Sequence, residues 1–146
     1  MRIDGQWLVG DDGVVRPVIS GDIRTADGSW EQCEFLVDTG ADRTVFNAAT
    51  LAKLGLQPLA MSEGLSGVGG MAASVIVETE IHLLREDTGH VVFRGQYAAI
   101  TELEALDISV LGRDITRLFA VIVDWPHDVV CRVGQRHCYT IAQDSG

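Results

Sequence analysis

Basic residues are few in this sequence. Of 146 residues, 11 are lysine or arginine and 21 are aspartate or glutamate, which gives a net charge of −10. Nucleic acids and anionic membranes would repel such a chain. Long apolar runs are also missing: none approaches the ~18 residues that span a bilayer, and residues 1–7 lack the apolar core of a signal peptide. We therefore expect no nucleic-acid partner and no membrane partner.

Cysteine and histidine are scarce and scattered. The cysteines Cys33, Cys131 and Cys138 are an odd number without the spacing of a metal site. No pair among the histidines has the spacing of metal ligands on a helix. We therefore predict no metal and no cofactor. The cysteine pattern also favours reduced thiols, and hence an intracellular, cytoplasmic protein.

Proline and aromatic residues are few as well, whereas glycine is plentiful. The chain has 3 prolines, 6% aromatics and 16 glycines, a composition that suits many short strands joined by tight turns. A hydrophobic share of 47% excludes disorder, and 146 residues are enough to bury one core. We predict one domain over residues 1–146, all-β or mainly β, with one or two short helices.

Turn signals divide the chain into apolar segments. Asp11-Asp12-Gly13 and Asp27-Gly28-Ser29 are typical turn sequences, and an apolar run over 14–23 lies between them. Residues 30–37 alternate loosely, as the partner strand of a hairpin would.

A short helix is predicted between Asn47 and Gly55, because asparagine caps helix starts and glycine ends helices. A glycine-dense tip follows over 66–71. The remaining apolar runs, bounded by turns at 86–89 and around Pro126, predict strands over 73–84, 91–100, 108–111, 120–124 and 129–133.

The most informative segment is Asp38-Thr39-Gly40, which directly follows the apolar residues Phe35–Val37. A carboxylate at the end of a buried strand is held by a rigid element, yet lies where the chain must turn. Gly40 permits a tight turn and a close approach of backbone to ligand. The tripeptide by itself is also a common turn, so its flanks decide how it is interpreted.

The chain contains a second copy, Asp87-Thr88-Gly89. It follows Leu84-Arg85-Glu86, so charged residues stand where a buried strand should lead in. His90 then stands where a small residue is expected. We interpret this copy as a surface hairpin turn.

The sequence resembles the retropepsin family, the retroviral-type aspartic peptidases, over residues 18–119. The resemblance rests on matched pieces in the family's order: 35–42 with Thr44-Val45 after it, the glycine-rich 67–70 where the family carries its flap, and Val110-Leu111-Gly112-Arg113-Asp114. Because the flanking polyprotein of a virus is missing, we expect a stand-alone cellular or bacterial member.

The motif count implies a homodimer. Peptide hydrolysis by carboxylates needs one group to accept a proton and another to donate one. In aspartic proteases two neighbouring carboxylates share a proton, since both cannot ionise comfortably. One motif in a chain long enough for one lobe predicts a two-fold axis between copies of Asp38. Residues 1–15, an added hairpin or an altered interface strand, and 124–146 match the family least.

The resemblance also implies a set of site residues and a polypeptide substrate. They are the catalytic Asp38, Thr39 and Gly40; the substrate contacts Gly40, Ala41, Asp42, Gly67, Val68, Gly69 and Gly70; and the ion pair Asp42–Arg113. The flap glycines could instead form an ordinary mobile hairpin, and the ion pair could be two solvated charges. Apolar residues around Val45, Val68 and Val110 suggest hydrophobic residues beside the cleaved bond.

Ala41 sets an expectation for pH, because pepsin-like relatives have a hydroxyl here that can hydrogen-bond the ionised carboxylate. Without it the charged form of the pair is less favoured, so we expect activity to peak at mildly acidic to near-neutral pH. Two alternatives stay open: the same fold used as a non-catalytic peptide-binding or assembly module, and an unrelated β domain with a coincidental turn.

Overall fold

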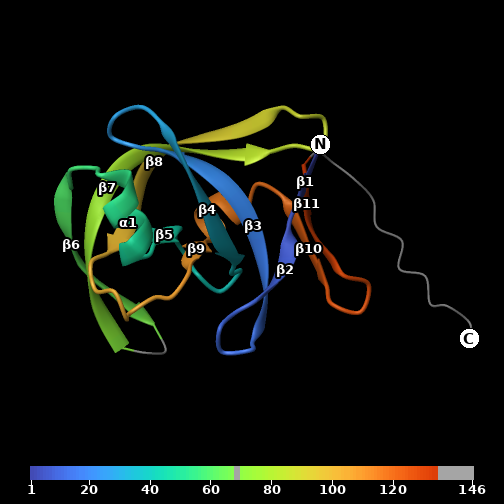
Figure 1. Ribbon diagram of the computed structural model, residues 1–146, viewed down its shortest axis with the longest axis horizontal. Helices are drawn as coiled ribbons and strands as arrows, with labels where there is room; N and C mark the ends of the chain where they lie inside the picture. The colour runs from blue at the N-terminus through green and yellow to red at the C-terminus, as the bar shows by residue number, and fades with distance from the viewer. Residues whose placement is uncertain (68–69, 135–146) are drawn as a thin grey trace, which may run out of the picture.

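The computed structural model describes residues 1–67 and 70–134, and within them the chain is mainly β, as predicted (Figure 1). The elements are β1 (Arg2–Asp4), β2 (Gln6–Val9), β3 (Val15–Arg24), β4 (Trp30–Val37), β5 (Val45–Phe46), α1 (Ala48–Leu54), β6 (Ala60–Gly67), β7 (Gly70–Leu84), β8 (His90–Ile100), β9 (Ser109–Leu111), α2 (Arg113–Thr116), β10 (Ala120–Asp124) and β11 (Val129–Val133).

The strands form two sheets. The larger sheet has the order β2-β3-β4-β9-β5-β8-β7-β6, and β3 also pairs with β7, so the sheet closes on itself. Its interior holds fully buried side chains, among them Ile19, Phe35 and Leu111. The Phe46 ring of β5 lies 6.1 Å from Phe35 and 5.6 Å from Tyr97, centroid to centroid. This aromatic packing gives the short strand β5 a rigid base.

The predicted hairpin of β3 and β4 is confirmed. The two strands pair in antiparallel register from Val18 opposite Leu36 to Arg24 opposite Trp30. The intervening turn uses Gly28 at φ 87° and Asp27, whose Oδ1 accepts bonds from Thr25 and from Ser29. The Ser29 and Thr25 hydrogen bonds lower the pKa of Asp27 to about 2.

The helix expected between Asn47 and Gly55 is also confirmed as α1. The Asn47 side chain accepts a hydrogen bond of 2.9 Å from the Thr50 amide, which satisfies one free donor of the first turn. Gly55 ends the helix in the left-handed conformation, at φ 62°. Asn47 and Ser109 are further joined through the Asn47 amide, so α1 is attached to β9.

The two ends of the described chain meet in the smaller sheet, of order β1-β11-β10. Ile3 of β1 lies opposite Arg132 of β11, whereas β2 forms a hairpin with β3. Residues 1–15 therefore contribute to both sheets. In Figure 1 this small sheet lies on one side of the molecule, away from the β6–β7 hairpin.

Cys33 and Cys131 are free, buried thiols, and burial raises the pKa of each. Cys138 lies outside the described residues. In the part of the chain that the structure describes, no helix is long and apolar enough to cross a membrane.

Candidate active site

Asp38 lies at the end of two buried parallel strands. β4 pairs with β9 in parallel register, with Val37 opposite Leu111, and both of these side chains are buried. The Asp38 amide continues the ladder by donating a hydrogen bond of 3.3 Å to the Leu111 carbonyl. The strands therefore fix the backbone of Asp38 just where the chain leaves the sheet.

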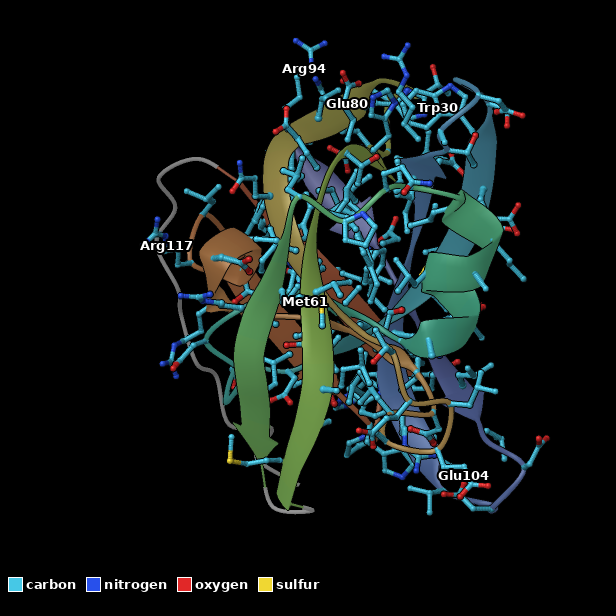
Figure 2. All side chains as sticks on the ribbon, turned by 90° about the vertical axis from the view of Figure 1, so that its left-hand side faces the viewer. Trp30, Met61, Glu80, Arg94, Glu104 and Arg117 are labelled. Carbon is cyan, nitrogen blue, oxygen red and sulfur yellow. The ribbon has the colours of Figure 1, made fainter. Side chains whose placement is uncertain are left out.

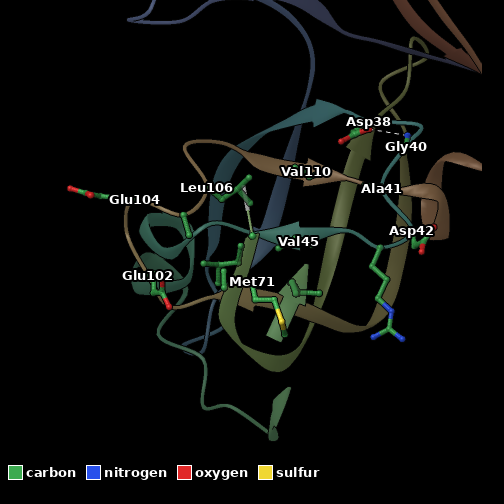
Figure 3. A pocket seen from close by; sticks show the side chains of 16 residues that line it. Asp38, Gly40, Ala41, Asp42, Val45, Met71, Glu102, Glu104, Leu106 and Val110 are labelled. Carbon is green, nitrogen blue, oxygen red and sulfur yellow. Dashed lines mark hydrogen bonds between the residues drawn. The ribbon is translucent and has the colours of Figure 1, made fainter. Parts of the chain in front are cut away.

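The turn after β4 orients the Asp38 carboxylate. The Gly40 amide donates a hydrogen bond of 2.9 Å to Asp38 Oδ1, drawn as the dashed line in Figure 3. The Ala41 amide approaches the Asp38 carbonyl at 3.4 Å. Thr39 and Gly40 are exposed, so the turn presents its backbone outward while Asp38 itself is half-buried.

The segment at the start of α2 holds this turn from behind. The Arg113 amide donates to the Ala41 carbonyl at 2.8 Å, and the Asp114 amide donates to the Asp42 carbonyl at 3.3 Å. Gly112 passes so close to Arg43 that a Cβ at position 112 would lie 2.3 Å from a backbone carbon of Arg43. Only glycine lets the two backbones approach this closely.

Thr44 and Asp114 lock the same contact with side chains. Thr44 is fully buried, and its Oγ1 donates to Asp114 Oδ1 at 2.8 Å while its amide donates to the same carboxylate at 3.0 Å. The Gly112 amide donates in turn to Thr44 Oγ1 at 3.2 Å. Both residues lie within the matched pieces of the sequence, but no role was predicted for either. The available signal was a threonine directly before the apolar Val45-Phe46.

The structure brings Asp42 and Arg113 together as an ion pair between Arg113 Nη2 and Asp42 Oδ1. Arg113 Nη1 also donates to the Thr39 carbonyl at 3.3 Å. Both side chains are exposed, at 79% for Asp42 and 54% for Arg113. In a single chain such a pair contributes little to stability, because water screens it.

Asp38 opens onto a cleft of about 920 Å³ between its own turn, the β6–β7 hairpin and the loop before β9 (Figure 3). The lining residues are Asp38, Gly40, Ala41, Asp42, Arg43, Val45, Leu65, Gly70, Met71, Ala72, Ile100, Glu102, Glu104, Ala105, Leu106 and Val110.

Several residues predicted from sequence therefore meet in this cleft. Val45 and Val110 line it from β5 and β9, and Gly70 lines it from the start of β7. Gly67 ends β6 and pairs with Gly70. Val68 and Gly69, predicted as flap residues, lie outside the described residues.

The loop over residues 101–107 is the part of the cleft that sequence reasoning missed. It is tied to β7, because the Thr101 amide donates to the Ala73 carbonyl at 3.1 Å and Glu102 Oε1 accepts from the Ala73 amide at 3.3 Å. Glu102 and Glu104 reach the cleft from this loop. No local pattern in the sequence indicates the contact, since it joins positions 29 residues apart.

The second tripeptide, Asp87-Thr88-Gly89, forms the exposed turn between β7 and β8, as interpreted from the sequence. Asp87 forms an ion pair with Arg85 and is not among the residues that line the cleft.

A closed β fold that presents a clasped Asp-Thr-Gly turn to an open cleft is the architecture of a retropepsin-like aspartic protease. The family model described as aspartyl protease matches residues 20–115, and the chain belongs to this family. The resemblance inferred from the sequence is thereby confirmed, and the alternative of an unrelated β domain was wrong.

Two solved structures share the fold. The EIAV protease, solved in complex with the inhibitor HBY-793, has a TM-score of 0.50 and 24% identity, and the match covers 70% of this chain and 86% of that one. A retropepsin-like aspartic protease from Rickettsia conorii has a TM-score of 0.52 and 20% identity, with 90% and 88% coverage. No curated protein matches this chain.

Proposed function

We propose that this chain, as one domain over residues 1–146, is a homodimeric aspartic endopeptidase that uses Asp38 from each of two copies. One observation carries the proposal: Asp38 stands at the end of buried parallel strands, is oriented by the Gly40 amide, and faces a cleft large enough for a peptide. Because the other tripeptide is an exposed turn outside the cleft, the described part of one chain brings one Asp-Thr-Gly carboxylate to the cleft.

In the proposed reaction a water molecule lies between the two Asp38 carboxyl groups, of which one is ionised and one protonated. The ionised carboxylate takes a proton from the water as the water oxygen attacks the peptide carbonyl carbon. The protonated carboxyl gives its proton to the carbonyl oxygen, which yields a tetrahedral diol. The carboxyl that took the water proton then gives it to the peptide nitrogen, while the other carboxylate takes a proton from a diol hydroxyl. The C–N bond breaks, which leaves an acid and an amine and restores one ionised and one protonated carboxyl.

The other site residues support this chemistry by position. Thr39 is exposed beside Asp38, which suits a contact with its counterpart across the two-fold axis. The backbone at Gly40, Ala41 and Asp42 lines the cleft and would bind the substrate main chain. The β6–β7 hairpin, in which Gly67 pairs with Gly70, would close over the substrate, and the Asp42–Arg113 pair would brace the turn.

A mixing experiment tests the shared site. Wild-type protein is mixed with increasing amounts of Asp38→Asn protein, and peptide cleavage is measured after the subunits have exchanged. Mixed dimers hold one carboxylate, so activity per wild-type chain should fall steadily as the variant is added, while sedimentation shows unchanged dimers. Activity that does not depend on the variant would contradict a shared site.

The same variant separates an enzyme from a binding module. Loss of cleavage with retained dimerisation supports the peptidase, whereas an undiminished biological function in Asp38→Asn supports a scaffold.

The expected pH optimum is a second prediction. Position 41 is alanine, so no hydroxyl at this position hydrogen-bonds the ionised pair, and activity should peak at mildly acidic to near-neutral pH. A pH–rate profile of kcat/KM checks this, and a rate still rising at pH ~3 would contradict it.

A further inference from the structure

Two acidic side chains in the cleft, Glu102 and Glu104, differ in their ion pairing from Glu80, which lies on the far side of the fold. Glu80 meets Arg94 at 2.8 Å and Arg24 at 3.6 Å. Within residues 1–67 and 70–134, neither Glu102 nor Glu104 forms an ion pair. Figure 2 shows Glu104 at the end of the molecule opposite to Glu80 and Arg94.

The cleft as a whole carries negative charge. Asp38, Asp42, Glu102 and Glu104 line it, and among the described lining residues Arg43 is the single basic one. A concave site lined by charges of one sign focuses the field and attracts ligands of the opposite sign. A cationic peptide would be attracted to this cleft, and an acidic peptide would be repelled.

The cleft has acidic residues on two sides and apolar residues between them. Figure 3 shows Glu102 and Glu104 on one side and Asp38 and Asp42 on the other. Between them lie the apolar side chains of Val45, Met71, Leu106 and Val110 (Figure 3). Leu65 also lines the cleft. The Met71 side chain is 74% exposed, so an apolar ligand group could cover it.

We propose that the cleft selects polypeptide segments with apolar residues at the cleaved bond and a lysine or arginine where the chain passes Glu102 and Glu104. The inference rests on the proposed peptidase function and names its substrate class. The apolar middle of the cleft accepts the residues beside the reacting carbonyl, and the two glutamates lie where a long cationic side chain can reach them. In a two-fold dimer the preference should appear on both sides of the cleaved bond.

The test uses a host peptide with two apolar residues at its centre and neutral polar residues elsewhere. Lysine, glutamine or glutamate is placed at each outer position in turn, and kcat/KM is measured for each peptide. At the favoured positions lysine should exceed glutamine by roughly three- to tenfold, because the two contacts are solvent-exposed. The preference should shrink at 1 M salt, where the Debye length falls to about 3 Å.

The matched variants assign the preference to these residues. Glu102→Gln with Glu104→Gln should abolish the lysine preference, so that the lysine and glutamine peptides are cleaved with equal kcat/KM. The side-chain oxygen of the glutamine introduced at position 102 can still accept from the Ala73 amide. The control, Glu78→Gln with Glu86→Gln, removes the same charge outside the cleft and should keep the preference.

The outcomes separate this inference from the proposed function. Equal cleavage of lysine, glutamine and glutamate peptides by the wild type would overturn the inference and leave the peptidase standing. Binding of labelled peptides to Asp38→Asn protein supplies a readout without turnover. If no peptide is cleaved but lysine peptides bind Asp38→Asn more tightly, and the glutamate-to-glutamine pair removes that gain, the inference holds and the peptidase fails. Equal binding of all peptides would overturn it.

Discussion

The two Asp-Thr-Gly turns of this chain share one hydrogen bond but differ in backbone conformation and in surroundings: Thr88 has a positive φ of 67°, whereas Thr39 does not. In each, the glycine amide donates to the aspartate Oδ1, at 2.9 Å from Gly40 to Asp38 and at 3.1 Å from Gly89 to Asp87. The first turn leaves a buried strand that is paired in parallel with β9. The second closes a hairpin after Leu84, which is 56% exposed.

The difference lies in what holds each turn from outside. The first is clasped by residues 112–114, through the Ala41 and Asp42 carbonyls and the Thr44–Asp114 contact. The second has the Arg85–Asp87 ion pair and the Arg85 amide bond to the Gly89 carbonyl within the turn, and from outside a backbone bond of 3.0 Å from the Glu86 amide to the Arg2 carbonyl. A tripeptide thus sets the direction of a carboxylate, whereas distant residues give it a rigid position and a cleft.

The largest expected contrast is in catalysis. Asp38→Asn should lower kcat/KM by roughly 10²- to 10⁴-fold, because the variant loses the group that transfers the proton. Asp87→Asn should retain wild-type kcat/KM, since Asp87 is exposed and lies outside the cleft. Peptide cleavage by the two purified variants measures the contrast, and a comparable loss in both would break it.

The next contrast is in stability. Gly112→Ala places a Cβ 2.3 Å from the Arg43 backbone, so the turn must shift, at a cost of about 1–3 kcal/mol. At Gly89→Ala the new Cβ lies 3.1 Å from the Asp87 carboxylate and 3.6 Å from the Arg85 guanidinium, and both are side chains that can move aside. Its effect should stay within about 0.5 kcal/mol. Urea unfolding measures the free energy of unfolding of both variants. An equal loss in the two would show that residues 112–114 do not hold the first turn rigidly.

A smaller contrast is expected between the two arginines. Arg113→Lys keeps a charge near Asp42 but loses the fork that also reaches the Thr39 carbonyl. Dimer affinity or turnover should fall by roughly two- to tenfold. Arg85→Lys, at the other turn, should change neither. Sedimentation and steady-state kinetics decide, and unchanged values for Arg113→Lys would count against the bracing role.

The smallest effect on stability at neutral pH is expected at Tyr97, a buried residue of β8. Burial, with a smaller effect from the Asp114 charge, raises the pKa of Tyr97 to about 12. The folded state thus holds a neutral phenol that ionises near pH ~10 in the unfolded chain. Because Tyr97 ionises more readily in the unfolded chain, it lowers the free energy of unfolding at high pH. Its contribution to stability is complete below pH ~10 and is lost as the pH rises to about 12.

Tyr97→Phe should therefore lose less stability than the wild type between pH ~10 and ~12. Unfolding by urea at several alkaline pH values measures the two slopes. Asp87→Asn serves as the control and should keep the wild-type slope, and equal slopes for Tyr97→Phe would contradict the assignment.

Local signals were reliable wherever a few adjacent residues decide the conformation. The helix α1 follows from Asn47 and Gly55 alone, because each satisfies or ends a turn by its own side chain or backbone. The limits of β4, β10 and β11 agree with the predicted runs for the same reason. The candidate site was partly predictable, since Asp38 follows directly from a buried strand.

The rest of the site depends on contacts between distant positions. Thr44 and Asp114 are 70 residues apart, and Arg113 reaches the Thr39 carbonyl across 74. The loop over 101–107 enters the cleft because β8 pairs with residues 74–84 of β7, which brings the loop beside Ala73. The pairing of β1 with β11 is of the same kind, and it left residues 1–15 open to two interpretations.

The sequence by itself determined a mainly-β chain with one carboxylate turn following a buried strand, because hydrophobic pattern and turn chemistry act over a few residues. The flanking residues also told the two identical tripeptides apart. Only the tertiary structure decided which distant residues hold the first turn, and which acidic side chains accompany it in the cleft. Those outcomes depend on strand pairing and side-chain burial, which join segments that are far apart along the chain.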